Sequence, residues 1–317
     1  MKFKIYKLQF NTPVHFGDGN LDETDMTFRS DRLFSSLCIE MLNKYGKPEL
    51  EKLLDLVKTN KLYLSDAMPY FEEEYFVPKP YITINRDNKI EDNGKSDKKK
   101  IKKMKYLPVS KLQEFIRGDF DNAEEVNKKI KKLGDKNFIT RSIINREDNI
   151  AKPYSVTSFS FIKNAGLYIV VKYEDEQSIN LINELLIELG ISGIGGRRSS
   201  GYGKFSITSV SDSDNIINEF DKLINHKKGI QMTISICLPK EDEIENALDS
   251  ANYVVIRNGG FVDNVYSIKN VKKKNIYYIS SGSCFKNSFD GDVYDVSFDK
   301  ENPIYRYAKP FFLNMGE

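Results

Sequence analysis

The sequence predicts an α+β protein whose N-terminal part is a ferredoxin-like domain. Segments that alternate polar and apolar residues, as strands do, are interleaved with segments of helical spacing. Apart from one polar insertion, their order along the chain is strand, helix, strand, strand, helix, strand. This is the βαββαβ order of the ferredoxin-like fold, which RNA-recognition modules also use. A glycine-rich loop separates the second helix of this unit from its last strand.

Each element of this unit has its own signal. Residues 2–10 alternate apolar and polar side chains and predict the first strand. Apolar residues spaced by three and four predict a helix in the segment 29–46, with Ser30 as its N-cap and Gly46 at its end. Residues 158–173 predict a β-hairpin, because alternating phenylalanines precede a turn and a β-branched run follows it. The other elements expected in this unit are a strand at 61–65, helices at 176–190 and 214–226, and a strand at 204–210.

A polar, basic insertion at about residues 86–150 interrupts the first domain. From residue 86 to residue 137 it carries 16 Lys and Arg against 10 Asp and Glu, and seven lysines fall between Lys95 and Lys105. Such a block is typical either of an electrostatic footprint for a polyanion or of a solvated loop. Two short helices are expected inside the insertion, at residues 110–118 and 123–134.

The chain is long enough for two domains that each bury a core. We assign residues 1–228, insertion included, to the first domain and residues 229–317 to the second. Alternating apolar residues in the second domain predict several short strands. These are expected at 232–238, 251–256 and 275–280 and in the C-terminal segment 305–313.

Composition narrows the possible function classes. The net charge is +2, no apolar run approaches the roughly 20 residues of a membrane span, and the N-terminus lacks the apolar block of a signal peptide. We therefore expect a cytoplasmic protein without membrane contact. The three cysteines are scattered, there are two histidines, and the acidic residues at 18–25 lack the spacing of a calcium loop. Neither a metal ion nor another cofactor is expected.

The segment GISGIGGRRSSGYGKF, residues 190–205, is the most informative stretch of the chain. It holds six glycines, which are costly unless the backbone must turn sharply or approach something closely. It is not a dinucleotide-binding fingerprint, because it follows a helix and opens a strand, and it lacks the ending of a P-loop. Its backbone N–H groups, two arginines and a tyrosine suit RNA phosphates and a stacked base, whereas the alternative is a plain turn with exposed arginines. The candidate RNA-binding residues of this loop are Gly193, Gly195, Gly196, Arg197, Arg198, Ser199, Ser200, Gly201, Tyr202, Gly203 and Lys204.

The glycines at 193, 195, 196, 201 and 203 form the pattern G-x-G-G-x-x-x-x-G-x-G. This pattern resembles the signature loop of the RAMP proteins of CRISPR systems. Other segments resemble one branch of that superfamily, the type III-A (Csm) effector subunit that caps the 5′ end of the guide RNA. They extend from residue 13 to residue 311, outside the lysine-rich insertion, and comprise PVHFG, RSDRLFSSL, RSIINREDN, SFIKNAGLYIVV, RNGGFV, SGSCF and NPIYRYAKPF.

The resemblance implies two ferredoxin-like (RRM-like) domains with a thumb-like insertion. It also implies binding of the repeat-derived 5′ handle of the CRISPR RNA (crRNA), and no catalytic activity. The implied protein partners are the large polymerase-like, signal-synthesising subunit and the backbone RAMP subunits of the Csm complex. The thumb would interrupt the duplex of guide and target RNA, so contact with target RNA is indirect. The family usually has Ser-Asp-Thr where this chain has Ser30, Asp31 and Arg32, which leaves the role of Arg32 open.

Several basic residues outside the loop are further candidates for RNA contact. Arg141 and Arg146 lie in the returning arm of the insertion, beside the expected thumb, and surface ion pairing is the alternative. Arg257 lies on a second glycine turn. Arg306 and Lys309 either bind RNA or brace the interface between the two domains. Arg29 and Arg32, at the start of the first helix, complete the set.

His15 is the residue that could make this protein an enzyme. Metal-independent RAMP ribonucleases use a histidine as general acid or base, and His15 follows the first strand, where it could face RNA. A histidine that orders its turn, or that contacts RNA without chemistry, is the alternative. Because PVHFG itself resembles the pattern of the non-catalytic cap subunit, we expect His15 to bind RNA rather than cleave it. A scaffold without any RNA contact is a third hypothesis, and it predicts no salt-dependent RNA affinity.

Overall fold

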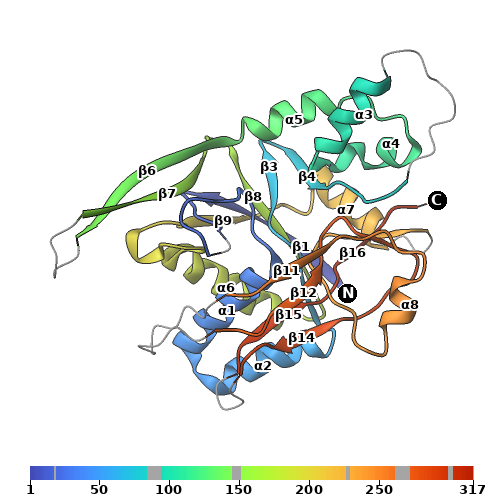
Figure 1. Cartoon of the computed structure of the whole chain (residues 1–317). Coiled ribbons are helices and arrows are strands. Elements are labelled where there is room, and N and C mark those ends of the chain that lie inside the picture. Colours follow the sequence, from blue (N-terminus) through green and yellow to red (C-terminus); the bar gives the residue numbers. More distant parts are fainter. Residues whose placement is uncertain are drawn as a thin grey trace.

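The computed structural model describes residues 1–17, 19–83, 94–144, 151–225, 229–260, 272–298 and 303–316. Its largest element is a seven-stranded sheet in the order β5–β4–β3–β8–β1–β9, with β2 also paired to β8 (Figure 1). The pairs within this sheet are antiparallel. An α+β architecture with antiparallel sheets is thereby confirmed. The strands are β1 (Lys2–Phe10), β2 (Leu62–Leu64), β3 (Met68–Phe71), β4 (Glu74–Pro78), β5 (Tyr106–Pro108), β8 (Ala165–Tyr173) and β9 (Phe205–Ser209).

Both faces of this sheet are buried, and β1 shows why. Successive side chains of a strand point to opposite faces, so Tyr6 and Leu8 enter one apolar cluster while Ile5 enters another. Three helices supply the first cluster, and three helices with the C-terminal strands supply the second. The first set is α1 (Ser30–Tyr45), α2 (Lys47–Lys58) and α6 (Glu176–Ser192); the second is α4 (Leu112–Arg117), α5 (Ala123–Lys131) and α7 (Asn215–Asn225).

The expected strand at 2–10 and the expected helices at 176–190 and 214–226 are confirmed by β1, α6 and α7. The second strand is shorter than expected and is followed by β3 and β4, which the sequence reading did not predict. Helix α2 was also missed. Its buried Leu53, Leu54 and Val57 repeat at helical spacing, so the sequence does carry a signal for it.

The insertion is not only polar, because part of it is buried in the apolar core. Leu107 of β5, Leu112 and Phe115 of α4, and Val126 of α5 are buried in the second apolar cluster. The lysine block begins in α3 (Gly94–Lys103), where the Lys100 ammonium lies 2.8 Å from a Glu124 carboxylate oxygen. The expectation that this block is a footprint for a polyanion stays a prediction.

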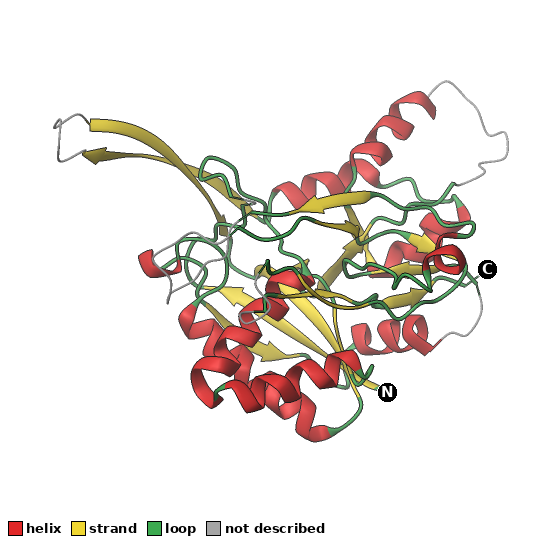
Figure 2. Cartoon of the chain, turned by 60° about the horizontal axis from the view of Figure 1, so that its bottom comes forward, coloured by secondary structure: helices red, strands yellow, loops and turns green. Residues whose placement is uncertain are grey.

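The end of the insertion and the segment that follows it form a long hairpin, which we call the thumb hairpin. It consists of β6 (Gly134–Ile144) and β7 (Ala151–Phe161), paired antiparallel along their whole length. Both views show it extending away from the body of the molecule (Figures 1 and 2). The prediction of a hairpin at 158–173 is wrong in its pairing, because β7 pairs with β6 whereas β8 pairs with β1, β2 and β3. A turn around Asn164, which has a positive φ of 65°, connects β7 of the thumb hairpin to β8 of the seven-stranded sheet.

The described C-terminal region forms three small antiparallel sheets rather than the longer strands expected. They are β13–β10–β16, β11–β12 and β14–β15. Met232, Ile234 and Phe311 of this region lie in the same apolar cluster as Ile5, so its core is continuous with that of the N-terminal part. The assignment of a second ferredoxin-like domain from residue 229 stays a prediction. The elements are β10 (Gln231–Thr233), α8 (Ile244–Leu248), β11 (Val255–Asn258), β12 (Ile276–Ile279), β13 (Cys284–Phe285), β14 (Asp292–Asp295), β15 (Tyr305–Ala308) and β16 (Phe312–Asn314).

The N-terminus of α1 is capped from outside the helix. Arg29, not Ser30, is the N-cap residue, and Ser30 is the first helical residue, so that prediction is wrong by one position. The Ser30 backbone N–H donates to Oδ1 of the buried Asp66 (2.8 Å). The same oxygen accepts the backbone N–H of Ile236 (3.1 Å), beyond β10. One carboxylate thus joins the start of α1 to the C-terminal region.

We expect Asp66→Ala to destabilise the whole chain. It would leave two buried N–H groups without an acceptor, at about 1–3 kcal/mol each. Asp66→Asn is the matched control, because its amide oxygen can replace Oδ1 and the side chain carries no buried charge. Thermal unfolding should therefore rank wild type and Asp66→Asn close together and Asp66→Ala well below both. Equal losses in the two variants would show that the charge, not the acceptor, matters.

The pH dependence of stability in wild type and in Asp66→Asn gives an independent check on the role of Asp66. Burial raises the pKa of the Asp66 carboxyl. A carboxyl whose pKa is higher in the folded than in the unfolded state makes folding take up a proton, so its contribution to stability grows as the pH falls. Wild type should therefore gain stability relative to Asp66→Asn on acidification.

Candidate RNA interface

The glycine loop, residues 193–204, is fastened to the segment that follows β1. The Gly196 N–H donates to the carbonyl oxygen of His15 (2.8 Å), and the Gly203 N–H donates to that of Pro13 (2.8 Å). The Lys204 N–H donates to Oγ1 of Thr12 (2.9 Å). The loop is therefore a packed structure, held by its own backbone against residues 12–15.

The glycines are needed mainly for this close packing. A Cβ at Gly195 would lie 2.7 Å from the His15 carbonyl oxygen, and one at Gly196 would lie 2.6 Å from the His15 ring. A Cβ at Gly203, where φ is +77°, would lie 2.0 Å from the carbonyl oxygen of Ile194. Gly201 also has a positive φ, but a Cβ at this position would meet no described atom within 4 Å apart from its neighbours in the chain.

This packing changes the interpretation of the loop's backbone donors. The sequence predicts a nest of N–H groups free for phosphate oxygens, but many of these donors bond to protein acceptors instead. Besides the three described above, the N–H groups of residues 193, 194, 200, 201 and 202 bond to carbonyl oxygens of the protein. The close approach that the glycines permit is to the chain's own backbone.

The two arginines of the loop differ in their surroundings. Arg197 has a left-handed backbone (φ 61°), and its guanidinium carbon lies 5.9 Å from the ring centroid of Tyr202. Its Nε is buried and has no hydrogen-bond partner among the described residues. Tyr202 is only 8% exposed, so its predicted role as a stacking surface for a base does not fit this conformation. Arg198 is half-buried, and Ser199, Ser200 and Lys204 are exposed.

His15 joins the glycine loop to the base of the thumb hairpin. Its ring is 5% exposed, and Nδ1 donates to the carbonyl oxygen of Thr157 in β7 (2.7 Å). Val14, one residue before, forms an isolated bridge with Phe159 of the same strand. A ring this deeply buried favours the alternative of a histidine that orders its turn over that of a general acid or base.

Arg32 now has a structural role. Its Nη2 donates to the carbonyl oxygen of Gly17 (2.8 Å), and its guanidinium carbon lies 5.9 Å from the Phe16 ring centroid. The charged side chain that departs from the family pattern thus anchors the loop that follows His15. Arg29, its neighbour at the helix cap, is half-buried.

The two basic residues of the C-terminal motif brace the protein. Arg306 lies 3.6 Å from an Asp31 carboxylate oxygen and donates to Oγ of Ser35 (3.0 Å), so it ties β15 to α1. Lys309 is fully buried and donates to the carbonyl oxygen of Gly291 (3.3 Å), and burial lowers its pKa. Of the two alternatives for this pair, bracing is the one that fits these contacts.

The remaining candidates lie on exposed strands or outside the described residues. Arg141 is exposed on β6, which is the outgoing strand of the thumb hairpin and not the returning arm that was predicted, and Arg257 is exposed on β11. Arg146 lies outside the described residues. Contacts across α1 bring the distant parts together: Arg32 reaches the loop at Gly17, and Asp31 accepts a hydrogen bond from Asn258 of β11 (2.8 Å). The glycine loop, the start of α1 and the end of β11 therefore adjoin one another.

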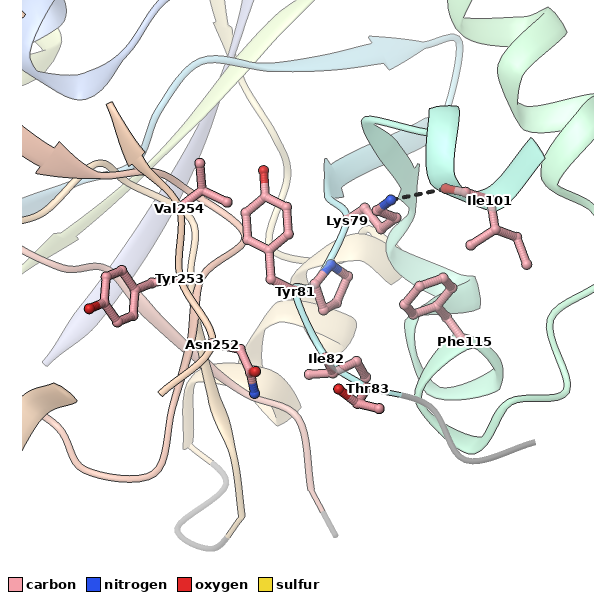
Figure 3. A pocket seen from close by; sticks show the side chains of 10 residues that line it. Lys79, Tyr81, Ile82, Thr83, Ile101, Phe115, Asn252, Tyr253 and Val254 are labelled. Carbon is pink, nitrogen blue, oxygen red and sulfur yellow. Dashed lines mark hydrogen bonds between the residues drawn. The ribbon is translucent and has the colours of Figure 1, made fainter. Parts of the chain in front are cut away.

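Two hollows lie elsewhere on the described surface, and neither includes a predicted site residue. One, of about 480 Å³, lies between the segment after β4, helices α3 and α4, and residues 252–254 (Figure 3). In it Lys79 donates to the carbonyl oxygen of Ile101 (2.9 Å), and burial lowers the pKa of the Lys79 ammonium. The other, of about 520 Å³, lies by the β3–β4 turn and contains Glu72, Glu73 and Glu219.

No cluster of His, Cys, Asp and Glu within the parts of the chain that the structure describes is suited to hold a metal ion. No helix within the same ranges has the length and apolar character needed to cross a bilayer.

Comparison with known proteins adds the family. A family model described as the RAMP superfamily matches residues 7–206, and one described as the CRISPR Csm4 C-terminal domain matches residues 226–315. A protein of Mycobacterium tuberculosis named "CRISPR system Cms protein Csm4" is 33% identical over 319 residues, covering 100% of this chain and 99% of the relative. The chain belongs to the Csm4 family of RAMP proteins. A Csm4 protein of Streptococcus thermophilus is 30% identical, with 99% of both chains covered.

Chains of solved assemblies that contain Csm4 share the fold. One chain of a crystal structure of the Csm3–Csm4 subcomplex in the type III-A CRISPR–Cas interference complex superposes with a TM-score of 0.66 at 20% identity. The match covers 98% of both chains. A chain of the Csm1–Csm4 cassette in complex with cA4 gives a TM-score of 0.64 at 17% identity, with 98% of this chain and 97% of that chain covered. The resemblance to type III-A RAMP proteins inferred from the sequence is confirmed.

Sequence reasoning missed several residues that shape this Csm4-family site. Asp66 and Thr157 act through hydrogen bonds to partners far along the chain, and no local pattern marks them. Asp31 was given no role of its own, although it accepts a hydrogen bond from Asn258 and pairs with Arg306. An Asp within an apolar stretch of sequence indicates a buried carboxylate that needs a partner, but it does not identify that partner.

Proposed function

We propose that this chain is a non-catalytic crRNA-binding subunit of a type III-A CRISPR effector complex in antiviral defence. It binds the 5′ handle of the guide RNA and links the large signal-synthesising subunit to the backbone subunits. Support comes from its membership of the Csm4 family and from the similar structures, which contain Csm4 with Csm3 or with Csm1. Two ferredoxin-like domains, 1–228 and 229–317, remain part of this proposal.

The main structural support for the proposal is the conformation of Arg197 and the lack of a partner for its Nε in the described part of the chain. The glycine loop holds this residue in a left-handed conformation, and its buried Nε has no partner among the described residues. A guanidinium donor that is buried without a partner is costly, and turning the side chain toward a phosphate would satisfy it, because arginine can donate two parallel N–H groups. Single-stranded RNA ends are recognised by such backbone contacts together with stacking.

The thumb hairpin supports the same function. Phe138, Ile143 and Ile144 are 73%, 62% and 65% exposed, and large exposed apolar side chains in one region mark an interaction surface. In the proposal this hairpin interrupts the duplex of guide and target RNA, and Arg141 contributes charge beside it. The apolar side chains then lie against bases rather than water.

Replacing both Arg197 and Arg198 by alanine tests the proposed function. The change removes charge and donors but leaves the glycines that set the backbone, so we expect a folded protein that binds handle RNA about tenfold more weakly. The slope of log affinity against log salt concentration should become shallower by about 0.7 for each lost phosphate contact on a single strand. Lys47→Ala with Lys52→Ala, on α2, is the charge-matched control and should bind as wild type does.

If the folded arginine variant kept full RNA affinity, the loop would be only a structural turn and would not bind RNA. Absence of salt-dependent RNA binding in wild type would instead favour a scaffold without RNA contact. The enzyme alternative has its own readout. Metal-independent cleavage of a repeat-containing transcript, lost in His15→Ala, would overturn the non-catalytic assignment.

A further inference from the structure

The hairpin formed by β11 and β12 has one buried and one exposed face. Ile276 and Tyr278 are buried in a small apolar cluster, and Ile256 packs against it. Arg257 and Tyr277, on the opposite face, are exposed, and 55% of Tyr277 is accessible to solvent. The fold therefore uses the inner face and leaves an aromatic ring and a guanidinium on the outer one.

The two exposed residues are direct neighbours. Arg257 and Tyr277 face each other in the antiparallel register, and side chains directly opposite on one face of a sheet lie within contact range. The two chain segments that contain the hairpin carry positive charges. Residues 251–260 and 272–281 contain Arg257 and three lysines at 272–274, and they contain no Asp or Glu. The charge of these two segments is complementary to that of a polyanion.

The hairpin adjoins the proposed handle-binding surface. Asn258, the last residue of β11, donates to the carboxylate of Asp31 in the first turn of α1 (2.8 Å). The next residue of that helix, Arg32, donates to the carbonyl of Gly17 in the loop that carries His15. Because the glycine loop bonds to His15, a strand of RNA leaving that loop can cross the start of α1 and reach the hairpin.

We propose that Tyr277 and Arg257 form a stacking subsite for one unpaired base of the guide RNA. The tyrosine ring takes the face of the base, and the guanidinium pairs with the neighbouring phosphate or extends the stack. An RNA occupant is favoured over a protein one because the charged residues of these two hairpin segments are all cations. The inference rests on the proposed function and adds a second contact point, on the C-terminal region, to the glycine loop.

The test compares Tyr277→Ala with Tyr277→Phe in the full chain. The probe is a single-stranded RNA of the repeat-derived handle sequence, together with copies in which one nucleotide after another is abasic. Tyr277→Ala should bind the intact probe about tenfold more weakly, because it removes one base–aromatic stack, whereas Tyr277→Phe should bind nearly as wild type does. The loss should disappear for one abasic position, since ring and base then act as a coupled pair. Tyr45→Ala, an exposed tyrosine at the far end of α1, is the control and should change nothing.

The possible outcomes separate the two proposals. If wild type binds the probe and Tyr277→Ala binds equally well, the subsite is wrong and the handle-binding function stands. If Tyr277→Ala keeps RNA but loses another subunit from the purified complex, the face is a protein-docking surface and the subsite is also wrong. If wild type does not bind the probe, the proposed function fails, and the subsite fails with it.

Discussion

Gly203→Ala is expected to disrupt the glycine loop, whereas Gly201→Ala is expected to leave it folded. Both glycines have a positive φ, of +77° and +83°, so alanine at either position carries a conformational cost of about 1–2 kcal/mol. The two positions differ in the room available for a Cβ atom. A Cβ at Gly203 would lie 2.0 Å from the carbonyl oxygen of Ile194, but one at Gly201 would meet no described atom within 4 Å beyond its chain neighbours. The pair therefore isolates steric overlap from backbone strain.

The overlap at Gly203 involves backbone that is already bonded. The Ile194 N–H donates to the Gly203 carbonyl oxygen (3.0 Å), and the Gly203 N–H donates to that of Pro13 (2.8 Å), so relief of the clash must break these links. We expect the total loss for Gly203→Ala to exceed about 3 kcal/mol, toward the range where single substitutions are exceptional. Thermal unfolding of both variants measures the difference.

RNA binding by the same two variants tests how the loop is used. Gly201→Ala should fold almost normally. Any decrease in its affinity for handle RNA would therefore mean that the RNA lies close to Gly201. Equal thermal stability of the Gly203 and Gly201 variants would contradict the packing role that we assign to the glycines.

Asp31→Ala is the second change with a large expected effect. Its carboxylate is buried, lies 3.6 Å from the Arg306 guanidinium and accepts a hydrogen bond from Asn258. Removing one partner of a buried ion pair leaves an uncompensated charge and costs about 3–5 kcal/mol. Because the pair joins α1 to β15, and Asn258 lies on β11, the variant should also loosen the C-terminal region against the helix.

A double-mutant cycle measures this pair directly. Asp31→Ala combined with Arg306→Ala removes both charges, so its loss in chemical unfolding should be clearly smaller than the sum of the two single losses. Arg306→Ala alone leaves Asp31 with its Asn258 hydrogen bond and should cost less than Asp31→Ala. Strictly additive losses would mean that the two side chains do not act as a pair.

The sequence was informative wherever the signal was local. The alternation in residues 2–10, the spacing of leucines in 176–190 and the glycine pattern at 193–203 each depend on neighbours in the chain, and they led to β1, α6 and the family. It was less informative for pairing. The hairpin expected at 158–173 failed because a turn residue such as Asn164 reports only that the chain reverses, not which strands it joins.

The candidate site divides in the same way. Arg197, Arg198 and the glycines were found from the loop itself, and the structure places them together on one packed loop. Tyr202 and Lys309 were also named, yet they are buried, because a side chain's exposure depends on segments that pack over it from elsewhere.

The sequence by itself determined the α+β class, the glycine loop and membership of the RAMP superfamily, since periodicity and short motifs are written in consecutive residues. Only the tertiary structure decided what the glycines approach, which is the backbone of His15, Pro13 and Ile194. It also decided that Asp66 and Asp31 hold the C-terminal region to α1. The contacts of these two carboxylates join segments that are distant in the sequence, and their energies come from burial and hydrogen-bond geometry that exist only once the chain is folded.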